Sequence, residues 1–447
     1  MRARYVAGTP REARRPGDHP GKRTLVGRLS RPLGVSMRHS AAAISAIGAV
    51  ALVLAAWGGS AFAASKPPSS AKASSSPINV CQISAESGPF IQLGQNDIMG
   101  LAAYVKYINS HGGVNGQKYN VTVENDNSDP SLAASLVRKC VEQDHAQFIM
   151  GPEETATMAA AIPVANSLHT VMITQGSGWN QGGVTNAEVH SYSFPGVFDV
   201  FYQDDVDTAV RLISPRHLTK VAVIQDGVPG GNVNGNYMQS LCKAHSCTVT
   251  GVQNLQPGQT DDTPQVLNLL SAKPDIIVLG LVPGPDTITA LKAIRAQDPT
   301  IPVSECSGCW TPGFLQAAGG TTVMNNVYLI ASTLQLMSDL PQNSTTNKDV
   351  VSQLKTYEEG MKAAGNSTED DLNNGTLAWA TGLELTDAIK KAGNTNENDV
   401  MKAMQHQNAE TLTIFWKRTP ENYAGLKSVV DLTSYWTPQG NLNILGG

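Results

Sequence analysis

A strand, helix, strand pattern over residues 78 to 130 constrains the fold of this chain more than any other feature. Ile78 to Ile83 alternates apolar and polar residues, and from Asp97 to Ile108 the apolar residues recur at helical spacing. Gly112-Gly113 ends the helix, because glycine readily adopts the left-handed conformation of a helix cap. Tyr119 to Val123 alternates again. Two strands joined by a helix predict a parallel α/β sheet whose strand ends face a crevice.

The same alternation of strands and helices continues well beyond this unit. Short apolar runs of the kind found in buried parallel strands recur at 146–150, 170–174, 220–225, 248–252, 275–281 and 301–304. Helical patterns separate them, and later helices are predicted over 348–364, 376–391 and 397–404. The sequence therefore predicts an α/β fold with two doubly wound, Rossmann-like lobes in succession.

The opening unit also carries a series of short motifs. In order they are Ser87-Gly88-Pro89, Gly94, Ile108-Asn109, Gly112-Gly113, Gly116, and the acidic loop from Asp126 to Asp129-Pro130. With these motifs the chain resembles the extracellular solute-binding proteins of ABC importers, in the family that holds the leucine/isoleucine/valine-binding proteins. The resemblance implies a type I periplasmic-binding-protein fold, with two lobes joined by a hinge that the chain crosses three times.

The resemblance also implies where the lobes divide. We expect lobe 1 to hold residues 78–196 and 333–415, and lobe 2 to hold residues 197–332 and 416–447. The three crossings are expected near Phe194 to Val197, Leu329 to Leu334 and Ile414 to Thr419, and Val429 to Ile444 is expected to return to lobe 2.

The N-terminal 77 residues are expected to target the protein rather than to fold with it. The apolar run Ala41 to Ala56 follows Arg38, and the small-x-small sequence Ala61-Phe62-Ala63 marks a cleavage site. Residues 1–63 are therefore interpreted as an upstream extension and a signal peptide cleaved after Ala63, and residues 64–77 as a flexible linker. Trp57 stands where a lipoprotein carries its acylated cysteine. We expect an exported protein without a lipid anchor, with lipid anchoring as the alternative if Trp57 were a sequence error.

Charge and motifs exclude several classes of function. The formal net charge is −5, and ten of the 32 Lys and Arg residues lie in the first 38 residues, so the remainder is strongly acidic. This composition argues against nucleic acid as a partner. Sequence motifs of serine hydrolases, P-loop proteins, zinc proteases and dinucleotide-binding proteins are absent. We expect neither enzymatic activity, nor a cofactor, nor a metal.

The chain has six cysteines, an even number that suits disulfides in an oxidising compartment. The favoured pairs are Cys81 with Cys140, Cys242 with Cys247, and Cys306 with Cys309. Metal binding by the last pair is the alternative, but no second CxxC or HxxxH supplies further ligands.

Loops at the carboxyl ends of the predicted strands supply the candidate ligand-binding residues. In lobe 1 they are Ser87, Glu154, Thr155, Gly176, Ser177 and Trp179, and Tyr202 and Asp226 follow in lobe 2. Thr155 matches a position where the family holds a ligand carboxylate, and a role as helix cap is equally open. Glu153 and Glu154 would repel a carboxylate or attract a cationic or hydroxylated ligand, unless they only stabilise a helix N-terminus. Trp179 could stack on a ring or sugar, or pack between loop and lobe.

Several features that the family uses to bind α-amino acids are missing. The loop that follows Asp226 has no aromatic residue, Val282 stands near an expected tyrosine, and Ser307-Gly308 replaces the acid that pairs with the ligand ammonium. An unpaired ammonium in a closed cleft costs several kcal/mol, so a branched-chain amino acid is not expected as the ligand.

These observations predict a monomeric extracellular protein of an ABC importer. It would capture a small polar ligand, such as an amino acid, an amide or a related compound, between two lobes and deliver it to a membrane permease. The alternative is a binding protein that senses a ligand and signals through a membrane receptor.

Overall fold

The computed structural model describes most of the chain after residue 75. The described residues are 76–175, 192–195, 209–210, 212–213, 215–227, 234–281, 284–305, 312–332, 348–367, 374–411, 414–420, 426–429 and 431–444. The expected extension, signal peptide and most of the linker lie outside them. Within these ranges, none of the helices combines the length and apolar character needed to span a bilayer.

Five parallel strands form the first sheet, in the order β2-β1-β3-β4-β5. Their bounds are β1 Ile78–Ser84, β2 Tyr119–Asn125, β3 Phe148–Met150, β4 Val171–Thr174 and β5 Ser193–Pro195. The predicted strands coincide with β1 to β4 to within a few residues at either end, as expected for short apolar segments bounded by turn residues.

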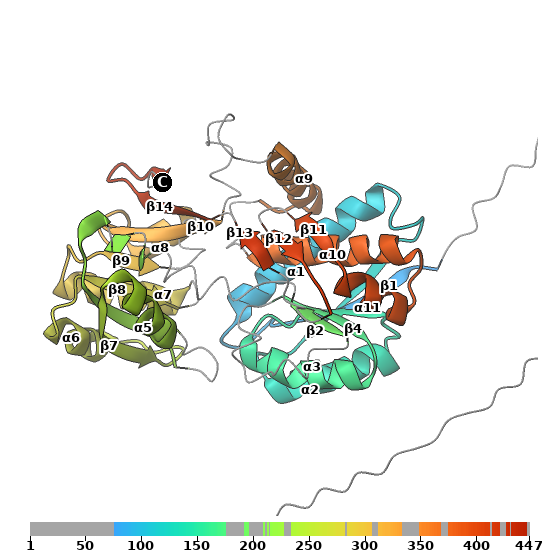
Figure 1. Ribbon diagram of the computed structural model, residues 1–447, viewed down its shortest axis with the longest axis horizontal. Coiled ribbons are helices and arrows are strands. Elements are labelled where there is room, and N and C mark those ends of the chain that lie inside the picture. The colour runs from blue at the N-terminus through green and yellow to red at the C-terminus, as the bar shows by residue number, and fades with distance from the viewer. Residues whose placement is uncertain are drawn as a thin grey trace, which may run out of the picture. The chain divides into compact units, whose positions relative to one another are not determined.

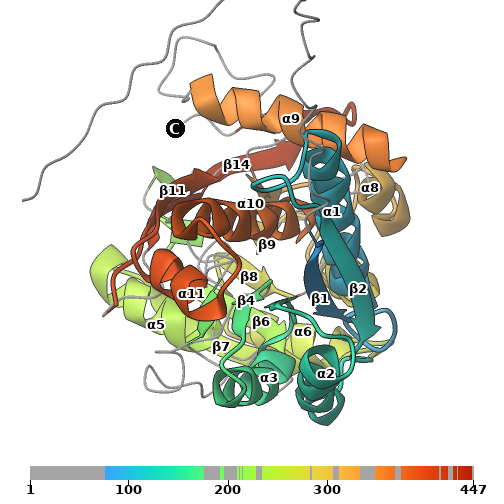
Figure 2. The same ribbon diagram turned by 90° about the vertical axis from the view of Figure 1, so that its right-hand side faces the viewer.

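Helices cover both faces of this sheet, and sheet and helices together are called the first lobe (Figure 2). The helices are α1 Ile91–Ser110, α2 Pro130–Glu142, α3 Thr155–Ser167, α9 Lys348–Ala364, α10 Asn374–Ala392 and α11 Glu397–Gln405. Alternate residues of β1 point to opposite faces. Ile78 and Val80 join the core beneath α1 and α10, whereas Cys81 and Ile83 join the core beneath α2 and α3. The late helices therefore complete a lobe that the first residues begin.

The second sheet has seven strands in the order β15-β14-β10-β9-β8-β6-β7. Their bounds are β6 Lys220–Asp226, β7 Thr248–Leu255, β8 Ile276–Gly280, β9 Val303–Glu305, β10 Val327–Ser332, β14 Asp431–Trp436 and β15 Leu442–Ile444. The connecting helices are α5 Asn234–His245, α6 Thr263–Ser271, α7 Pro285–Gln297 and α8 Pro312–Ala318. This sheet and its helices form the second lobe (Figure 1).

The two sheets repeat one topology. The second sheet begins β7-β6-β8-β9-β10, the same relative order as β2-β1-β3-β4-β5 in the first. In both sheets, the second strand lies on one side of the first strand, and the third strand lies on the other side. Right-handed crossovers between the strands place helices on both faces of the sheet. The fold is thus the two-lobed, doubly wound α/β fold that the sequence predicts.

Strands of the C-terminal segment add antiparallel pairings. β14 pairs with β10, and β15 pairs with β14, so these strands of the C-terminal segment join the second sheet. A small third sheet, not predicted from the sequence, contains β11 Asn408–Thr411, β12 Ile414–Lys417 and β13 Leu426–Val429. The chain leaves this small sheet after Val429 and enters the second sheet at Asp431. The residue boundaries of the lobes stay a prediction.

Two of the three predicted disulfides are present. Cys81 in β1 is bonded to Cys140 in α2, and Cys242 in α5 is bonded to Cys247 just before β7. The third predicted pair, Cys306 with Cys309, lies outside the described residues.

Helix α1 begins earlier than the sequence suggested. The helical spacing in the sequence starts at Asp97, but α1 starts at Ile91, so Gly94 lies in its first turn. A Cβ atom at this position would lie 2.2 Å from the carbonyl oxygen of Ala85. Glycine is needed here because helix and strand end approach closely, and not because the chain turns.

Candidate functional site

The candidate site lies at the carboxyl end of the first sheet, where the strand order reverses. Open α/β sheets bind ligands at such a switch point, in the crevice beyond the strand ends. Here the reversal falls between β1 and β3, because α1 leads from β1 to one neighbour and α2 leads back across to the other. The loops after β1, β2 and β3 meet at this edge, since β2 and β3 flank β1 on either side.

The loop after β1 is fastened to the loop after β2. The Ser87 hydroxyl donates to Asn127 Oδ1 at 2.6 Å and accepts from Asn125 Nδ2 at 2.8 Å. Gly88 has a φ of +90°, and a Cβ atom there would lie 2.5 Å from the carbonyl oxygen of Asn127. The predicted site residue Ser87 is therefore half-buried and hydrogen-bonded to the end of β2 and to the acidic loop that follows it.

Glu153 lies on the other side of β1 and reaches back to it. Its Oε1 atom accepts a hydrogen bond of 2.8 Å from the backbone N–H of Ala85, the residue that follows β1. The side chain is buried, with 4% of the residue exposed. Burial, and after it the charge of Asp126, raises the pKa of Glu153 to about 8. At neutral pH this carboxyl group therefore mostly keeps its proton.

Glu154 caps helix α3. Its Oε2 atom accepts from the backbone N–H of Thr157 at 2.8 Å, which satisfies one of the free donors at the helix N-terminus. Burial raises the pKa of Glu154, and its hydrogen bonds to Ala156 and Thr157 oppose that shift. Thr155, the predicted partner of a ligand carboxylate, is the buried first residue of α3. Glu154 thus performs the capping role that the sequence had left open for Thr155.

Asp126 is a third buried acid at this edge, and it was expected in the acidic-loop motif but not among the ligand-binding residues. It follows β2, is 1% exposed, and accepts through Oδ1 from the backbone N–H of Ser128. Burial raises the pKa of Asp126, and its charge in turn raises the pKa of Glu153 and Glu154. A signal was present in the sequence, since Asp126 begins the acidic loop after the strand predicted from Tyr119 to Val123.

A buried amide pair connects the first sheet to α10. Gln82 Nε2 donates to Gln175 Oε1 at 3.2 Å, and Gln175 Nε2 donates to the hydroxyl of Thr381 at 3.3 Å. Gln175 is the residue after β4, and its backbone N–H also bonds to the carbonyl of Pro152. These polar side chains hold the loop that carries Glu153 and Glu154. Sequence patterns did not reveal them, because each looked like an isolated polar residue in an apolar strand region.

The remaining predicted site residues divide into two groups. Asp226 is buried at the end of β6, on the carboxyl edge of the second sheet beside its own switch point between β6 and β8. Gly176, Ser177, Trp179 and Tyr202 lie outside the described residues. The structure therefore brings Ser87, Glu154 and Thr155 to one edge of the first sheet and places Asp226 on the second.

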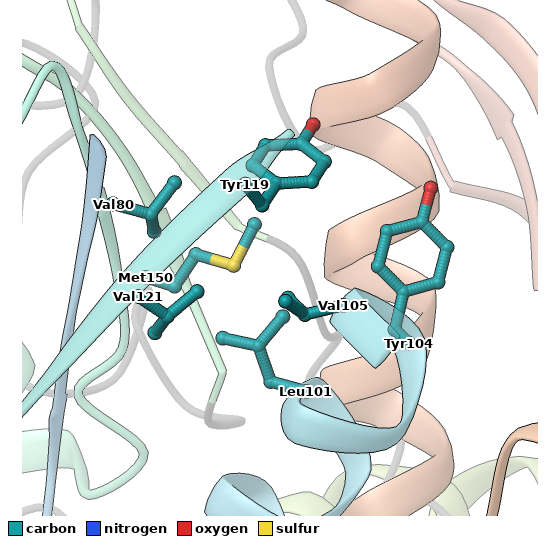
Figure 3. A pocket seen from close by; sticks show the side chains of 7 residues that line it. All are labelled: Val80, Leu101, Tyr104, Val105, Tyr119, Val121 and Met150. Carbon is teal, nitrogen blue, oxygen red and sulfur yellow. The ribbon is translucent and has the colours of Figure 1, made fainter. Parts of the chain in front are cut away.

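A cavity in the first lobe is a packing gap and not the candidate site. It holds about 160 Å³ of space between atoms. Seven side chains line it: Val80, Leu101, Tyr104, Val105, Tyr119, Val121 and Met150. Figure 3 shows both tyrosine hydroxyls turned away from the aliphatic side chains, and both bond to the hydroxyl of Thr386. The lining therefore offers no uncommitted polar group to orient a ligand.

Metal-ligating residues gather at one place in the described part of the chain. Ligand-type atoms of Cys81, Cys140 and Asp144 lie within 4.8 Å of one another. The two sulfurs form a disulfide, so neither is available as the thiolate that a metal would need.

Comparison with known proteins identifies the family. Residues 77–425 match the periplasmic binding protein family, and the chain belongs to it. An amino acid binding protein of Pseudomonas aeruginosa is 23% identical over 252 residues, which are 54% of this chain and 63% of that protein. The chain thus spans less than two thirds of that relative. A Leu/Ile/Val-binding protein homolog of Brucella suis is 21% identical over 72% of this chain and 80% of that protein.

Solved structures share the fold at low sequence identity. An extracellular ligand-binding receptor from Rhodopseudomonas palustris aligns with a TM-score of 0.71 and 18% identity, over 83% of this chain and 99% of that one. An ABC transporter solute binding protein from R. palustris, solved in complex with 4-hydroxybenzoate, aligns with a TM-score of 0.67 and 17% identity, over 82% and 95% of the two chains. The family and the two-lobe fold predicted from the sequence are confirmed.

Proposed function

We propose that this protein is the extracellular solute-binding component of an ABC importer. It would close its two lobes on a small polar organic solute and present the closed form to a membrane permease. The observation that carries the proposal is the pair of α/β lobes with one repeated strand order, each with a switch point at its carboxyl edge, in a chain of the periplasmic binding protein family. The proteins in that family are binding proteins, which also favours capture of a solute over catalysis.

The mechanism follows from contacts that a solute makes with both lobes. A ligand shifts a two-state equilibrium toward the state that it binds better, so contacts available only between closed lobes favour closure. On the first lobe we assign the solute to the crevice beside Glu153 and Glu154, and on the second to the edge that carries Asp226. Ser87, Thr155, Gly176, Ser177, Trp179 and Tyr202 remain proposed contacts.

A thermal-shift screen tests the solute-binding step. The exported form would be mixed with amino acids, amides, polyols, amines and aromatic acids, and each hit would be titrated by calorimetry. Binding of 100 Kd of a solute stabilises a protein by about 2.7 kcal/mol, which a melting curve resolves. The transport step would be tested by deleting the gene and measuring uptake of the identified solute. Unchanged uptake would favour a sensing role instead.

Export is the part of the proposal that concerns the N-terminus. We propose that the signal peptide is removed after Ala63 and that residues 64–77 tether the folded part. N-terminal sequencing of the protein recovered from outside its cells should give Ala64 as the first residue. Recovery of a fatty-acylated form, detected with a palmitate analogue, would instead support lipid anchoring.

A further inference from the structure

The first lobe's crevice uses its own carboxyl groups to fill two positions that would attract an anion. One is the backbone N–H of Ala85 at the end of β1, which donates to Glu153 at 2.8 Å. The other is the backbone N–H of Thr157 in the first turn of α3, which donates to Glu154 at 2.8 Å. Helix N-termini and strand-end amides at a switch point are the groups that hold phosphates and carboxylates in α/β proteins. Here both are already occupied.

A solute carboxylate could enter only by displacing one of these side chains. Glu153 is 4% exposed and Glu154 is 8% exposed, so a displaced carboxyl group would be left buried without its donor. Burial of an unpaired polar group costs about 1–3 kcal/mol, and of an unpaired charge considerably more. The exchange would therefore place the solute carboxylate on the backbone donor and leave the displaced glutamate carboxyl group buried without a donor.

The charge around these positions also opposes an anion. Asp126 interacts electrostatically with both Glu153 and Glu154. Among the described residues, no lysine, arginine or histidine forms an ion pair with any of the three acids. The charge of Asp126 adds to the effect of burial in raising the pKa of Glu153, and the same charge would repel a negative group of a solute.

One acceptor atom at this edge still lacks a donor. Within the part of the chain that the structure describes, Oδ2 of Asp126 is buried and makes no hydrogen bond. Buried oxygens of this kind are rarely left unpaired in folded proteins. A solute group that donates a hydrogen bond would satisfy this oxygen, whereas a carboxylate would add two further acceptors.

We propose that the first-lobe crevice selects a solute whose inserted end is a nitrogen donor group, an amide or an ammonium, and that Asp126 excludes a carboxylate there. This inference rests on the proposed solute-binding function and specifies its ligand. It also agrees with the expectation that a branched-chain amino acid is not the ligand, because a family member that binds free amino acids must accommodate a carboxylate.

Matched acid, amide and amine probes test the inference. The full exported protein would be titrated with sets such as leucine, leucinamide and isopentylamine, and 4-hydroxybenzoate, 4-hydroxybenzamide and 4-hydroxybenzylamine, extended to each solute class found by the thermal-shift screen. We expect the amide or amine of a binding set to have a Kd at least tenfold below that of its acid.

Asp126→Asn tests whether the charge and the unpaired oxygen of Asp126 set the preference. The asparagine keeps an oxygen for the Ser128 N–H, removes the charge, and places an NH₂ donor where Oδ2 stood. We expect the preference for amide over acid to fall at least tenfold in this variant. Glu153→Gln, measured at pH 8.5 where the parent carboxyl is mostly ionised, should shift the preference in the same direction, and provides a second route if Asp126→Asn does not fold. The control is Glu142→Gln, which makes the same chemical change at an exposed residue near the end of α2 and should leave the preference unchanged.

The outcomes are distinct. An acid that binds as tightly as its amide, with a ratio that neither variant changes, overturns the inference but leaves solute binding intact. Absence of binding by every probe and every screened solute overturns the proposed function, and this inference with it.

Discussion

Arg418 donates two hydrogen bonds of 3.0 Å to Oε2 of Glu384, and both side chains are completely buried. The same guanidinium group bonds to Oε1 of Gln407 and to the backbone carbonyl of Pro195, the last residue of β5. Burial raises the pKa of Glu384, and Arg418 opposes that shift by stabilising the ionised form. The pair therefore joins the end of β5, helix α10 and the residue after β12.

Removal of Arg418 should be costly because Glu384 would remain buried without its partner. We expect Arg418→Met to lower the free energy of unfolding by about 3–5 kcal/mol in urea titrations at pH 7. The double variant Glu384→Leu with Arg418→Met should recover much of that loss, because it removes both charges. Arg138→Met, at an exposed position of α2, should change stability little. A single variant at Arg418 as stable as the parent would contradict this account.

The raised pKa of Glu153 predicts how stability depends on pH. Its ordinary value is 4.5 and its value in the fold is about 8, so folding favours the protonated form. The stability that comes from protonation of Glu153 in the folded state is fully present below pH 4.5 and is lost as the pH rises through 8. Glu153→Gln should therefore match the parent near pH 5 and exceed it in stability by a few kcal/mol at pH 8.5.

Urea unfolding at the two pH values measures this difference, with Glu142→Gln as the control. Other titrating groups, including Glu384, are common to both proteins and cancel in the comparison. Parallel pH profiles for Glu153→Gln and the parent would show that the Glu153 carboxyl does not titrate in this range.

The two disulfides should stabilise the protein unequally. Cys81 and Cys140 are 59 residues apart, whereas Cys242 and Cys247 are 5 apart. A crosslink constrains the unfolded chain more when it closes a longer loop, by about 4 kcal/mol for the first and about 2 kcal/mol for the second. We expect the variant with Cys81→Ala and Cys140→Ala to unfold at a lower urea concentration than the variant with Cys242→Ala and Cys247→Ala. Equal midpoints would indicate that loop length does not decide the effect.

The third pair of cysteines gives a prediction that needs no mutation. If Cys306 and Cys309 are also bonded, the unreduced protein in denaturant contains no thiol that reacts with iodoacetamide. Reduction should then expose all six. Two reactive thiols before reduction, mapped by mass spectrometry to residues 306 and 309, would rule out this disulfide.

Gly100 marks the closest approach of α1 to α10. A Cβ atom at Gly100 would lie 1.9 Å from the carbonyl oxygen of Gly375. Alanine normally stabilises a helix interior by about 0.5–1 kcal/mol relative to glycine, but overpacking costs about 1–3 kcal/mol. Gly100→Ala should therefore destabilise the protein in thermal unfolding. Gly313→Ala in α8, where an added Cβ meets no atom within 4 Å, should be neutral or stabilising.

Much of the architecture was predictable because local patterns determine it. Buried parallel strands and amphipathic helices have distinct periodicities, so β1 to β4, β6 to β9 and α9 to α11 could be located from sequence alone. The pairing of Cys81 with Cys140 was also predicted, and α2 packs on β1 as this bond requires. The small sheet of β11, β12 and β13 was missed, since its strands are only four residues long and Ile414 to Thr419 was interpreted as a crossing between the lobes.

The candidate site was predictable only in part, because distant segments create it. The sequence indicated the loop that carries Glu153 and Glu154. It could not show that Glu153 turns back to Ala85, 68 residues earlier, or that Asp126 lies beside it. Those relations arise from the strand order β2-β1-β3, which brings three separate loops to one edge.

The pairing of β14 with β10 has a consequence for how the protein is made. Segments near the C-terminus finish both lobes: α10 packs on α1 in the first, and β14 covers the edge of β10 in the second. When synthesis has reached only β10, neither lobe can therefore form its complete core. Until β14 emerges, β10 presents an open edge to which another nascent chain can pair. Completion of both halves is therefore a late event in synthesis, and a product truncated before β14 should aggregate rather than persist as a stable single lobe.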